Sequence, residues 1–156
     1  LRTVSLRLTN AYGPRMRIRD ERQTFIGWWF RQLLEGRTLS IYGDGLQVRD
    51  FNFVEDVVEA LLMVAAHEVA DGQIYNLGSD DPINLLNLAR LMVEVNGGGT
   101  FELLPFPADR KRIDIGDYYG DYRRIRSKLG WRPMVGLRDG LTRTMDYFRA
   151  NLEHYV

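Results

Sequence analysis

Arg49 is the side chain whose neighbours most strongly indicate chemistry in this sequence. It lies in the stretch YGDGLQVRDF, residues 42–51, six residues after Gly43 and directly before Asp50. Two upstream glycines remove side chains beside the expected strand, so a ligand could approach the backbone closely. A guanidinium forms paired, charge-assisted hydrogen bonds with phosphate oxygens. The pattern indicates a phosphate-binding arginine near the surface; the alternative is a solvated arginine on an edge strand.

The composition excludes several other chemistries. The chain has 156 residues, no cysteine, and histidines only at positions 67 and 154. Disulfides, thiolate catalysis and cysteine-ligated metals are therefore excluded. The two histidines are far apart in sequence, and we interpret both as solvated residues near helix ends. The formal net charge is zero, which argues against nucleic acid or an anionic membrane as the main partner, because both require basic charge.

The sequence indicates neither a membrane span nor a signal peptide. Its longest apolar run, residues 60–66, is far shorter than the ~20 residues that a membrane-spanning helix needs. The chain begins with Leu1 rather than Met, which suggests a piece of a longer protein or a trimmed tag. We expect a cytoplasmic protein.

Strands and helices alternate along the chain, which predicts an α/β fold. Strands are expected at residues 3–8, 39–42, 48–54, 73–78 and 100–106. Helices are expected at residues 24–36, 54–67, 84–99, 121–130 and 136–152. Residues 9–14 and 15–23 are expected to be loops, and Asp44-Gly45 predicts a tight hairpin turn.

Helical spacing of apolar residues predicts which side of each helix is buried. For residues 24–36 the predicted side is Phe25, Trp28, Trp29 and Leu33. For residues 54–67 it is Val54, Val57, Val58, Leu61, Leu62 and Ala65. For residues 136–152 it is Leu137, Leu141, Met145, Phe148 and Leu152. Asn84 and Asp121 are predicted to cap the helices that follow them.

Four motifs occur in the order found in extended short-chain dehydrogenase/reductases. They are LRLTNAYGPR, LSIYGDGLQVRDFNFVEDVVEAL, IYNLGS and DYRRIRSKLGWRP. The chain resembles the NAD-dependent nucleotide-sugar epimerase/dehydratase family over essentially all its residues, but only the C-terminal half of that family. The resemblance implies one domain over residues 1–156, with residues 1–10 at the last major Rossmann strand. It further implies a small mixed sheet with flanking helices, lacking most of the Rossmann sheet.

The resemblance also implies roles for individual residues. Those implied to bind a UDP- or dTDP-linked sugar are Asn10, Ile41, Tyr42, Gly43, Arg49, Phe51, Lys111, Arg112 and Asp114. In this assignment Arg49 contacts the diphosphate and Asp114 the ribose, and Lys111 is the second phosphate-binding cation unless the register shifts to Arg112. Phe51 replaces a residue that is often tyrosine. Residues implied to face NAD, only when the N-terminal half is present, are Asn10, Tyr12, Gly13 and Pro14.

Two parts that the family's chemistry needs are missing from this sequence. There is no G-x-G-x-x-G turn to place a cofactor pyrophosphate at a helix N-terminus. There is no Tyr-x-x-x-Lys pair for proton transfer, because the only lysines, Lys111 and Lys128, follow Pro107 and Arg124 at that spacing. We therefore expect no catalysis and no NAD binding by this chain alone.

The sequence leaves three functional hypotheses open. The first is the nucleotide-sugar-binding part of an NAD-dependent epimerase or dehydratase. The second is a free-standing, non-catalytic binding module. The third is a remnant that associates through apolar surface exposed on residues 3–8 and on helix 24–36. Its partner would be a second copy of the chain or a separate Rossmann half. The sequence distinguishes neither uridine from thymidine nor epimerase from dehydratase.

Overall fold

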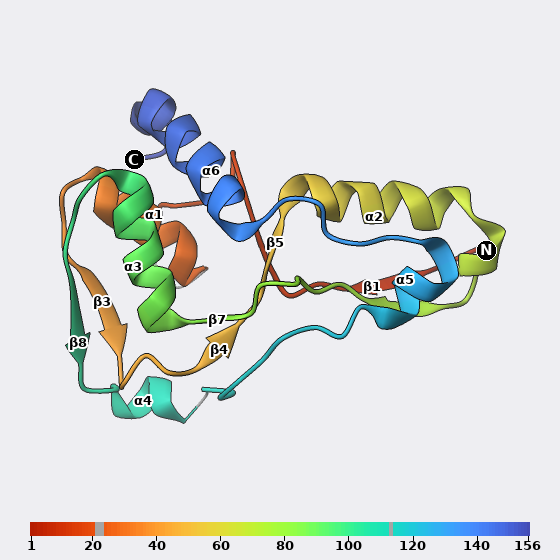
Figure 1. The fold of residues 1–156 in the computed structure, drawn as a ribbon, viewed down its shortest axis with the longest axis horizontal. Coiled ribbons are helices and arrows are strands. Elements are labelled where there is room, and N and C mark those ends of the chain that lie inside the picture. Colours follow the sequence, from red (N-terminus) through yellow and green to blue (C-terminus); the bar gives the residue numbers. More distant parts are fainter. Residues whose placement is uncertain (21–23, 113) are drawn as a thin grey trace.

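The computed structural model, which describes residues 1–20, 24–112 and 114–156, confirms the α/β class. Its strands form four two-stranded sheets (Figure 1). The parallel pairs are β1 (Ser5–Arg7) with β6 (Ile74–Asn76), β2 (Asn10–Tyr12) with β5 (Phe51–Phe53), and β3 (Leu39–Tyr42) with β8 (Phe101–Leu104). The antiparallel pair is β4 (Val48–Arg49) with β7 (Ile83–Asn84). The mixed character of the strand pairing is as expected, but the pairs do not join into one sheet.

The five predicted helices are confirmed, with small shifts at their ends. The helices are α1 (Phe25–Leu34), α2 (Val54–Ala66), α3 (Leu85–Asn96), α4 (Ala108–Lys111), α5 (Arg123–Leu129) and α6 (Leu137–Asn151), with 3₁₀ turns at Glu68–Ala70 and Leu152–His154. Asn84 caps α3 as predicted, because its side chain accepts a hydrogen bond from the Asn87 amide at 2.8 Å. Asp121 accepts one from the Arg123 amide at 3.0 Å, although the N-cap position of α5 is Tyr122. The sequence did not predict α4.

Two predictions about the strands are wrong. Residues 10–12 are not a loop, since Asn10 lies opposite Phe51 in the β2–β5 pair. Residues 39–42 and 48–54 do not form a hairpin, because β3 pairs with β8 and β4 pairs with β7. Gly43 and Gly45, with φ of 77° and 69°, therefore redirect the chain between two separate sheets. The loop prediction holds for residues 15–20, where only Ile18 is fully buried, and residues 21–23 lie outside the described part.

Two apolar clusters lie at the two ends of the elongated molecule (Figure 1). The larger cluster is built by α1, α3, α6 and β3, and its fully buried members include Phe30, Leu88, Met145 and Phe148. The smaller cluster joins α2, α5 and β6 around Tyr75, Ile125 and Trp131. The β2–β5 pair runs between the two ends and connects them.

The predicted buried face of α2 is mostly wrong, because only Val57 of the six predicted residues is buried. Its buried apolar residues are Val57, Ala60 and Val64, whereas Val58, Leu61 and Leu62 are 47–63% exposed. The helix is apolar around most of its circumference, and the described elements cover only one side of it. The sequence analysis also expected apolar surface of helix α1 to be exposed. This is wrong, because Ile26, Trp29, Phe30 and Leu33 are buried. The exposed side of α2 is therefore an apolar surface that no described element covers.

We predict that the isolated chain self-associates through this face of α2. Contiguous exposed apolar surface promotes association in water, and no described strand pairs with the second edge of β1. Sedimentation velocity should detect a dimer or larger species. Replacing Val58 and Leu62 together with aspartate should yield monomer, whereas Leu46→Asp, at an exposed apolar residue outside α2, should leave association intact. A concentrated wild-type sample that remains monomeric would contradict the prediction.

Candidate functional site

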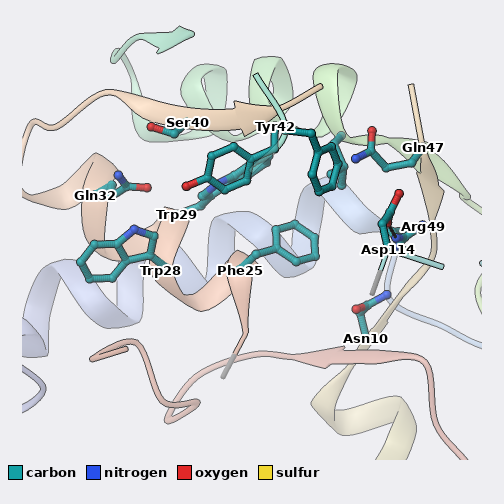
Figure 2. Close-up of a pocket in the computed structure, with 12 residues that line it drawn as sticks. Asn10, Phe25, Trp28, Trp29, Gln32, Ser40, Tyr42, Gln47, Arg49 and Asp114 are labelled. Carbon is teal, nitrogen blue, oxygen red and sulfur yellow. Dashed lines mark hydrogen bonds and ion pairs between the residues drawn. The ribbon is translucent and has the colours of Figure 1, made fainter. Parts of the chain in front are cut away.

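A cavity of about 440 Å³ lies where α1, β3, β4 and the segments after β8 and α4 meet (Figure 2). Its lining residues come from five parts of the chain far apart in sequence. They are Asn10, Phe25, Trp28, Trp29, Gln32, Ser40, Tyr42, Gln47, Arg49, Leu85, Phe106 and Asp114. Aromatic side chains line most of the cavity, and Asn10, Arg49 and Asp114 lie together at one end (Figure 2). The cavity is therefore apolar and flat-walled at one end and charged at the other.

One wall of the cavity is a face of α1. Phe25, Trp28, Trp29 and Gln32 follow one another at i, i+3, i+4 and i+7, which places them on the same side of a helix. Trp29 also packs edge-on against Phe25, with ring centroids 5.3 Å apart. The sequence predicted this aromatic group as core, and in the structure it separates the core from the cavity.

Strand β3 supplies the opposite wall through its alternating side chains. Ser40 and Tyr42 line the cavity, whereas Ile41 is buried in the core on the other face of the strand. Gly43 follows with a left-handed backbone, and a Cβ atom there would lie 3.1 Å from the Phe106 ring. Of Ile41, Tyr42 and Gly43, which the resemblance implies bind the nucleotide sugar, the structure thus places the Tyr42 side chain in the cavity. The binding roles of Ile41 and Gly43 stay predictions.

Arg49 lies at the charged end of the cavity and is held by several contacts. Its Nη1 donates to the carbonyl oxygens of Val48, at 2.8 Å, and of Gly116. Its Nη2 lies 3.4 Å from Asp114 Oδ1. The side chain is only 12% exposed, so the expected position near the surface is wrong. Since a guanidinium has five N–H donors, these three contacts leave others for a ligand.

The backbone around Arg49 is fixed by the buried carboxylate of Asp50. One Asp50 oxygen, Oδ2, accepts hydrogen bonds from the amides of Ser79, at 3.2 Å, and Gly120, at 2.9 Å. The Asp50 carbonyl accepts a third from Asn10 Nδ2 at 2.9 Å. Burial raises the pKa of Asp50, although the amide donors oppose this shift. These bonds hold Asn10, in β2, and Arg49, in β4, close together at the edge of the cavity although the two strands belong to different sheets.

The other predicted substrate residues are dispersed. Lys111 and Arg112 are exposed and are not part of the cavity lining, whereas Asp114 is part of it. Phe51 is buried in the core, where its ring packs edge-on against Tyr12 and Phe25 at centroid distances of 6.1 Å. The structure therefore brings Asn10, Tyr42, Arg49 and Asp114 together, and it leaves Lys111, Arg112 and Phe51 outside the cavity.

Residues 12–14, predicted to face NAD, border a second and more open hollow of about 600 Å³. Glycine is required at position 13, because its φ is 151° and a Cβ atom would lie 2.5 Å from Val54 Cγ1. Tyr12 is buried, and its hydroxyl donates to the Leu137 carbonyl at 3.3 Å. Burial and nearby carboxylates raise the pKa of Tyr12 far above its ordinary value. The hydrogen bond of this hydroxyl connects β2 to the first residue of α6.

The described residues contain neither a grouped set of metal ligands nor a helix that could span a membrane. Within residues 1–20, 24–112 and 114–156, no three histidine, cysteine, aspartate or glutamate side chains are grouped so that they could hold a metal ion. In the same ranges, no helix has both the length and the apolar character needed to cross a membrane. His67 and His154 are exposed near helix ends, as expected.

Sequence reasoning missed several residues that line the main cavity. They are Gln32, Ser40, Gln47, Leu85 and Phe106. Three of them had a usable signal: Gln32 lies one helical turn after Trp28, Ser40 lies two positions before Tyr42, and Gln47 lies two positions before Arg49. Leu85 and Phe106 had none, because tertiary packing alone brings their segments to the cavity.

Comparisons with known proteins agree with this architecture. Residues 1–78, half of the chain, match the NAD dependent epimerase/dehydratase family. A UDP-glucuronic acid decarboxylase 1 from Xenopus tropicalis is 35% identical over 152 residues, which cover 95% of this chain and 34% of the relative. The crystal structure of a UDP-glucose 4-epimerase from Thermotoga maritima, solved with UDP-glucose, is 32% identical with a TM-score of 0.84, covering 97% of this chain and 47% of that one.

A third similar protein is a dTDP-glucose 4,6-dehydratase from Streptomyces venezuelae, solved with NAD. It is 28% identical with a TM-score of 0.82, and the match covers 96% of this chain and 44% of that one. The chain thus spans between a third and a half of the length of these relatives. Since the family model matches half of the chain, and the similar relatives and solved structures cover nearly all of it, this chain belongs to the NAD-dependent epimerase/dehydratase family.

Proposed function

We propose that this chain is the nucleotide-sugar-binding part of an NAD-dependent epimerase or dehydratase. It would hold a UDP- or dTDP-linked sugar so that the C4 hydroxyl can be oxidised, and it would have no catalytic activity alone. The observation that carries this proposal is the cavity, which joins an aromatic, flat-walled section to a buried guanidinium at its far end. A nucleoside diphosphate has the same arrangement, with a flat base at one end and anionic phosphates at the other.

The residues at the charged end can perform the roles that this proposal needs. Arg49 has remaining N–H donors for phosphate oxygens, and its position is fixed by the carbonyls of Val48 and Gly116. Asp114, 3.4 Å from Arg49, offers a carboxylate that can accept hydrogen bonds from ribose hydroxyls. Because these groups are held in place before the ligand arrives, they would assist the reaction by positioning the substrate rather than by taking part in the chemical step.

The described residues do not by themselves fit NAD. A dinucleotide pyrophosphate is usually bound by a glycine-rich turn at a helix N-terminus, and this sequence has no such motif. The hollow beside Gly13 and Pro14 is also lined by Arg15 and by Val54 and Glu55 at the start of α2, but no glycine-rich turn leads into that helix. In this proposal NAD, which takes up and returns the hydride, is bound mainly by a part of the enzyme that lies outside these 156 residues.

The relatives bear the names of decarboxylases, epimerases and dehydratases. These reactions share a nucleotide-linked substrate and differ in the later chemistry at the sugar, so the binding residues described above suit all three classes. A self-associating remnant without a ligand is the second candidate, and the exposed apolar face of α2 favours it. The two candidates differ in whether a nucleoside diphosphate binds the cavity.

We predict that the isolated chain binds UDP or dTDP weakly, binds NAD no better than background, and turns over no UDP- or dTDP-sugar. Much of a site shared by two domains is lost when one is absent, which lowers affinity. Isothermal titration calorimetry with UDP, dTDP and NAD, and product analysis after incubation with UDP-glucose and NAD, test this. Micromolar NAD affinity or any turnover would refute the catalytic part of the proposal, and no nucleotide binding would favour the second candidate.

A further inference from the structure

We infer that a hollow lined by Arg15, Arg17 and Arg19 binds an extended, acidic peptide segment of a partner protein. This basic hollow has a volume of about 390 Å³ and is bounded by residues 15–19 and residues 154–156. It shares no lining residue with the main cavity. The inference therefore goes beyond the proposed function and does not depend on it.

Core packing holds the three arginines on one side of their segment. Exposed and less exposed side chains alternate over residues 15–19, which is the pattern of an extended chain. Ile18 is fully buried and Met16 packs against the larger apolar cluster, whereas the three arginines are exposed. The Arg19 carbonyl also accepts a hydrogen bond from Arg31 Nη1 at 3.2 Å. The arginine side chains thus extend into solvent from an anchored backbone.

The backbone of Arg15 has an unusual conformation. Its φ is 69°, and among the residues that the structure describes no other non-glycine residue has a positive φ. The left-handed region is costly for a residue with a Cβ atom, and such residues concentrate at functional sites. This observation supports a role for the segment beyond connecting β2 to α1.

The positive charge of the basic hollow is uncompensated. Its three arginines form no ion pair or side-chain hydrogen bond with any described residue. Arg31, Arg138 and Arg149, by contrast, each pair with a carboxylate. The fourth basic side chain of the lining, His154, lies 3.7 Å from Glu153. In a chain whose formal net charge is zero, three adjacent unpaired cations favour an anionic partner.

The spacing of the arginines matches the carboxylates of an extended acidic peptide. Side chains two positions apart in an extended chain lie on the same side, about 6 to 7 Å from each other. A peptide with acidic side chains at alternate positions has the same repeat, so its carboxylates can pair with the guanidinium groups in register. No strand in the described ranges pairs with residues 15–19, which leaves the segment open to an extended partner.

Single-stranded nucleic acid fits the basic hollow less well. Proteins that bind it usually combine basic charge with aromatic rings on which the bases stack. The aromatic side chain of this lining is Tyr155, whose ring packs edge-on against Phe148 at a centroid distance of 5.0 Å. Its hydroxyl lies 2.7 Å from the Tyr147 hydroxyl. The hollow therefore offers charge without a free ring for stacking.

The test is fluorescence anisotropy of the 156-residue chain with two labelled five-residue peptides of equal charge. One has glutamate at positions 1, 3 and 5 with serine between them, and the other has the three glutamates in succession. The alternating peptide should bind the wild-type chain about fivefold more tightly or better, an effect limited by the small contribution of each exposed ion pair. Raising the salt concentration should weaken this binding.

Two double variants that remove the same charge locate the binding. Arg17→Ser with Arg19→Ser should weaken binding of the alternating peptide at least about fivefold and abolish the preference between the peptides. Lys128→Ser with Arg132→Ser, at two exposed cations in and after α5, should leave both unchanged. UDP affinity should be the same in all three proteins, because none of these four residues lines the main cavity.

The outcomes decide the inference without reference to the proposed function. Failure of the alternating peptide to bind would overturn it. Equal affinity for the two peptides, or equal losses in the two double variants, would overturn it as well, because attraction to net charge alone would then explain the binding. If hexathymidylate binds more tightly than the peptide and is lost in Arg17→Ser with Arg19→Ser, the hollow binds nucleic acid instead. Because the two peptides are compared on the wild-type chain, the result does not depend on whether the variants fold.

Discussion

Replacing Arg49 with alanine should weaken UDP binding by about 1.5 to 3 kcal/mol, the scale of a hydrogen bond to a charged group. Arg49 is the one basic residue in the cavity lining formed by the described residues, and its side chain is largely withdrawn from solvent. Arg49→Lys should recover only part of the loss, because lysine keeps the charge but lacks the planar, two-pronged donor. Calorimetric titration of the three proteins measures both effects.

The same substitution should also lower stability, since Arg49 connects β4 to the segment around Gly116 and to Asp114. Thermal melts must therefore accompany the titrations, which are run well below the lowest melting temperature. Arg138→Ala is a suitable control, because Arg138 pairs with Glu94 on the exposed surface away from the cavity. Equal UDP affinity in wild type, Arg49→Ala and Arg49→Lys would show that Arg49 is only a structural residue.

The sequence predicts most of the local structure because that structure depends on nearby residues. The cap of α3 is an example: Asn84 and the left-handed Gly97 delimit this helix with no help from the rest of the chain. Strand pairing is different. Asp44-Gly45 has the composition of a hairpin turn, yet β3 pairs with β8, which lies far downstream in the chain. A local turn signal cannot report a partner that only the tertiary fold brings close.

The exposed face of α2 shows a second limit. Apolar spacing indicates that a surface must be covered, but it does not indicate by what, and the described elements cover only the side with Val57, Ala60 and Val64. In the cavity, Arg49 could be proposed from its neighbours in sequence. Phe106 could not, because only the tertiary fold brings the segment after β8 to the cavity.

Asp56 should be the most costly single polar side chain to remove from the smaller apolar cluster. Its buried carboxylate accepts hydrogen bonds from the amides of Met134, at 2.9 Å, and Val135, at 3.1 Å, and thereby ties the first turn of α2 to the segment between α5 and α6. The Asp56 carbonyl also accepts from Trp131 Nε1 at 3.0 Å. Asp56→Ala leaves two amide donors unpaired, which should lower the free energy of unfolding by about 3 kcal/mol.

Urea denaturation of Asp56→Ala and Glu55→Ala measures this effect against a matched control. Glu55 is the preceding residue in the same turn, but it is exposed and pairs with Arg143 at the surface, so its removal should change stability by less than about 1 kcal/mol. Asp56→Asn should be nearly as destabilising as alanine, because a carboxamide keeps only one of the two acceptor oxygens. Since Asp56 is not part of the cavity lining, UDP affinity measured under conditions where the variant is folded should be unchanged. A loss of UDP affinity without a loss of stability would instead place Asp56 in the binding site.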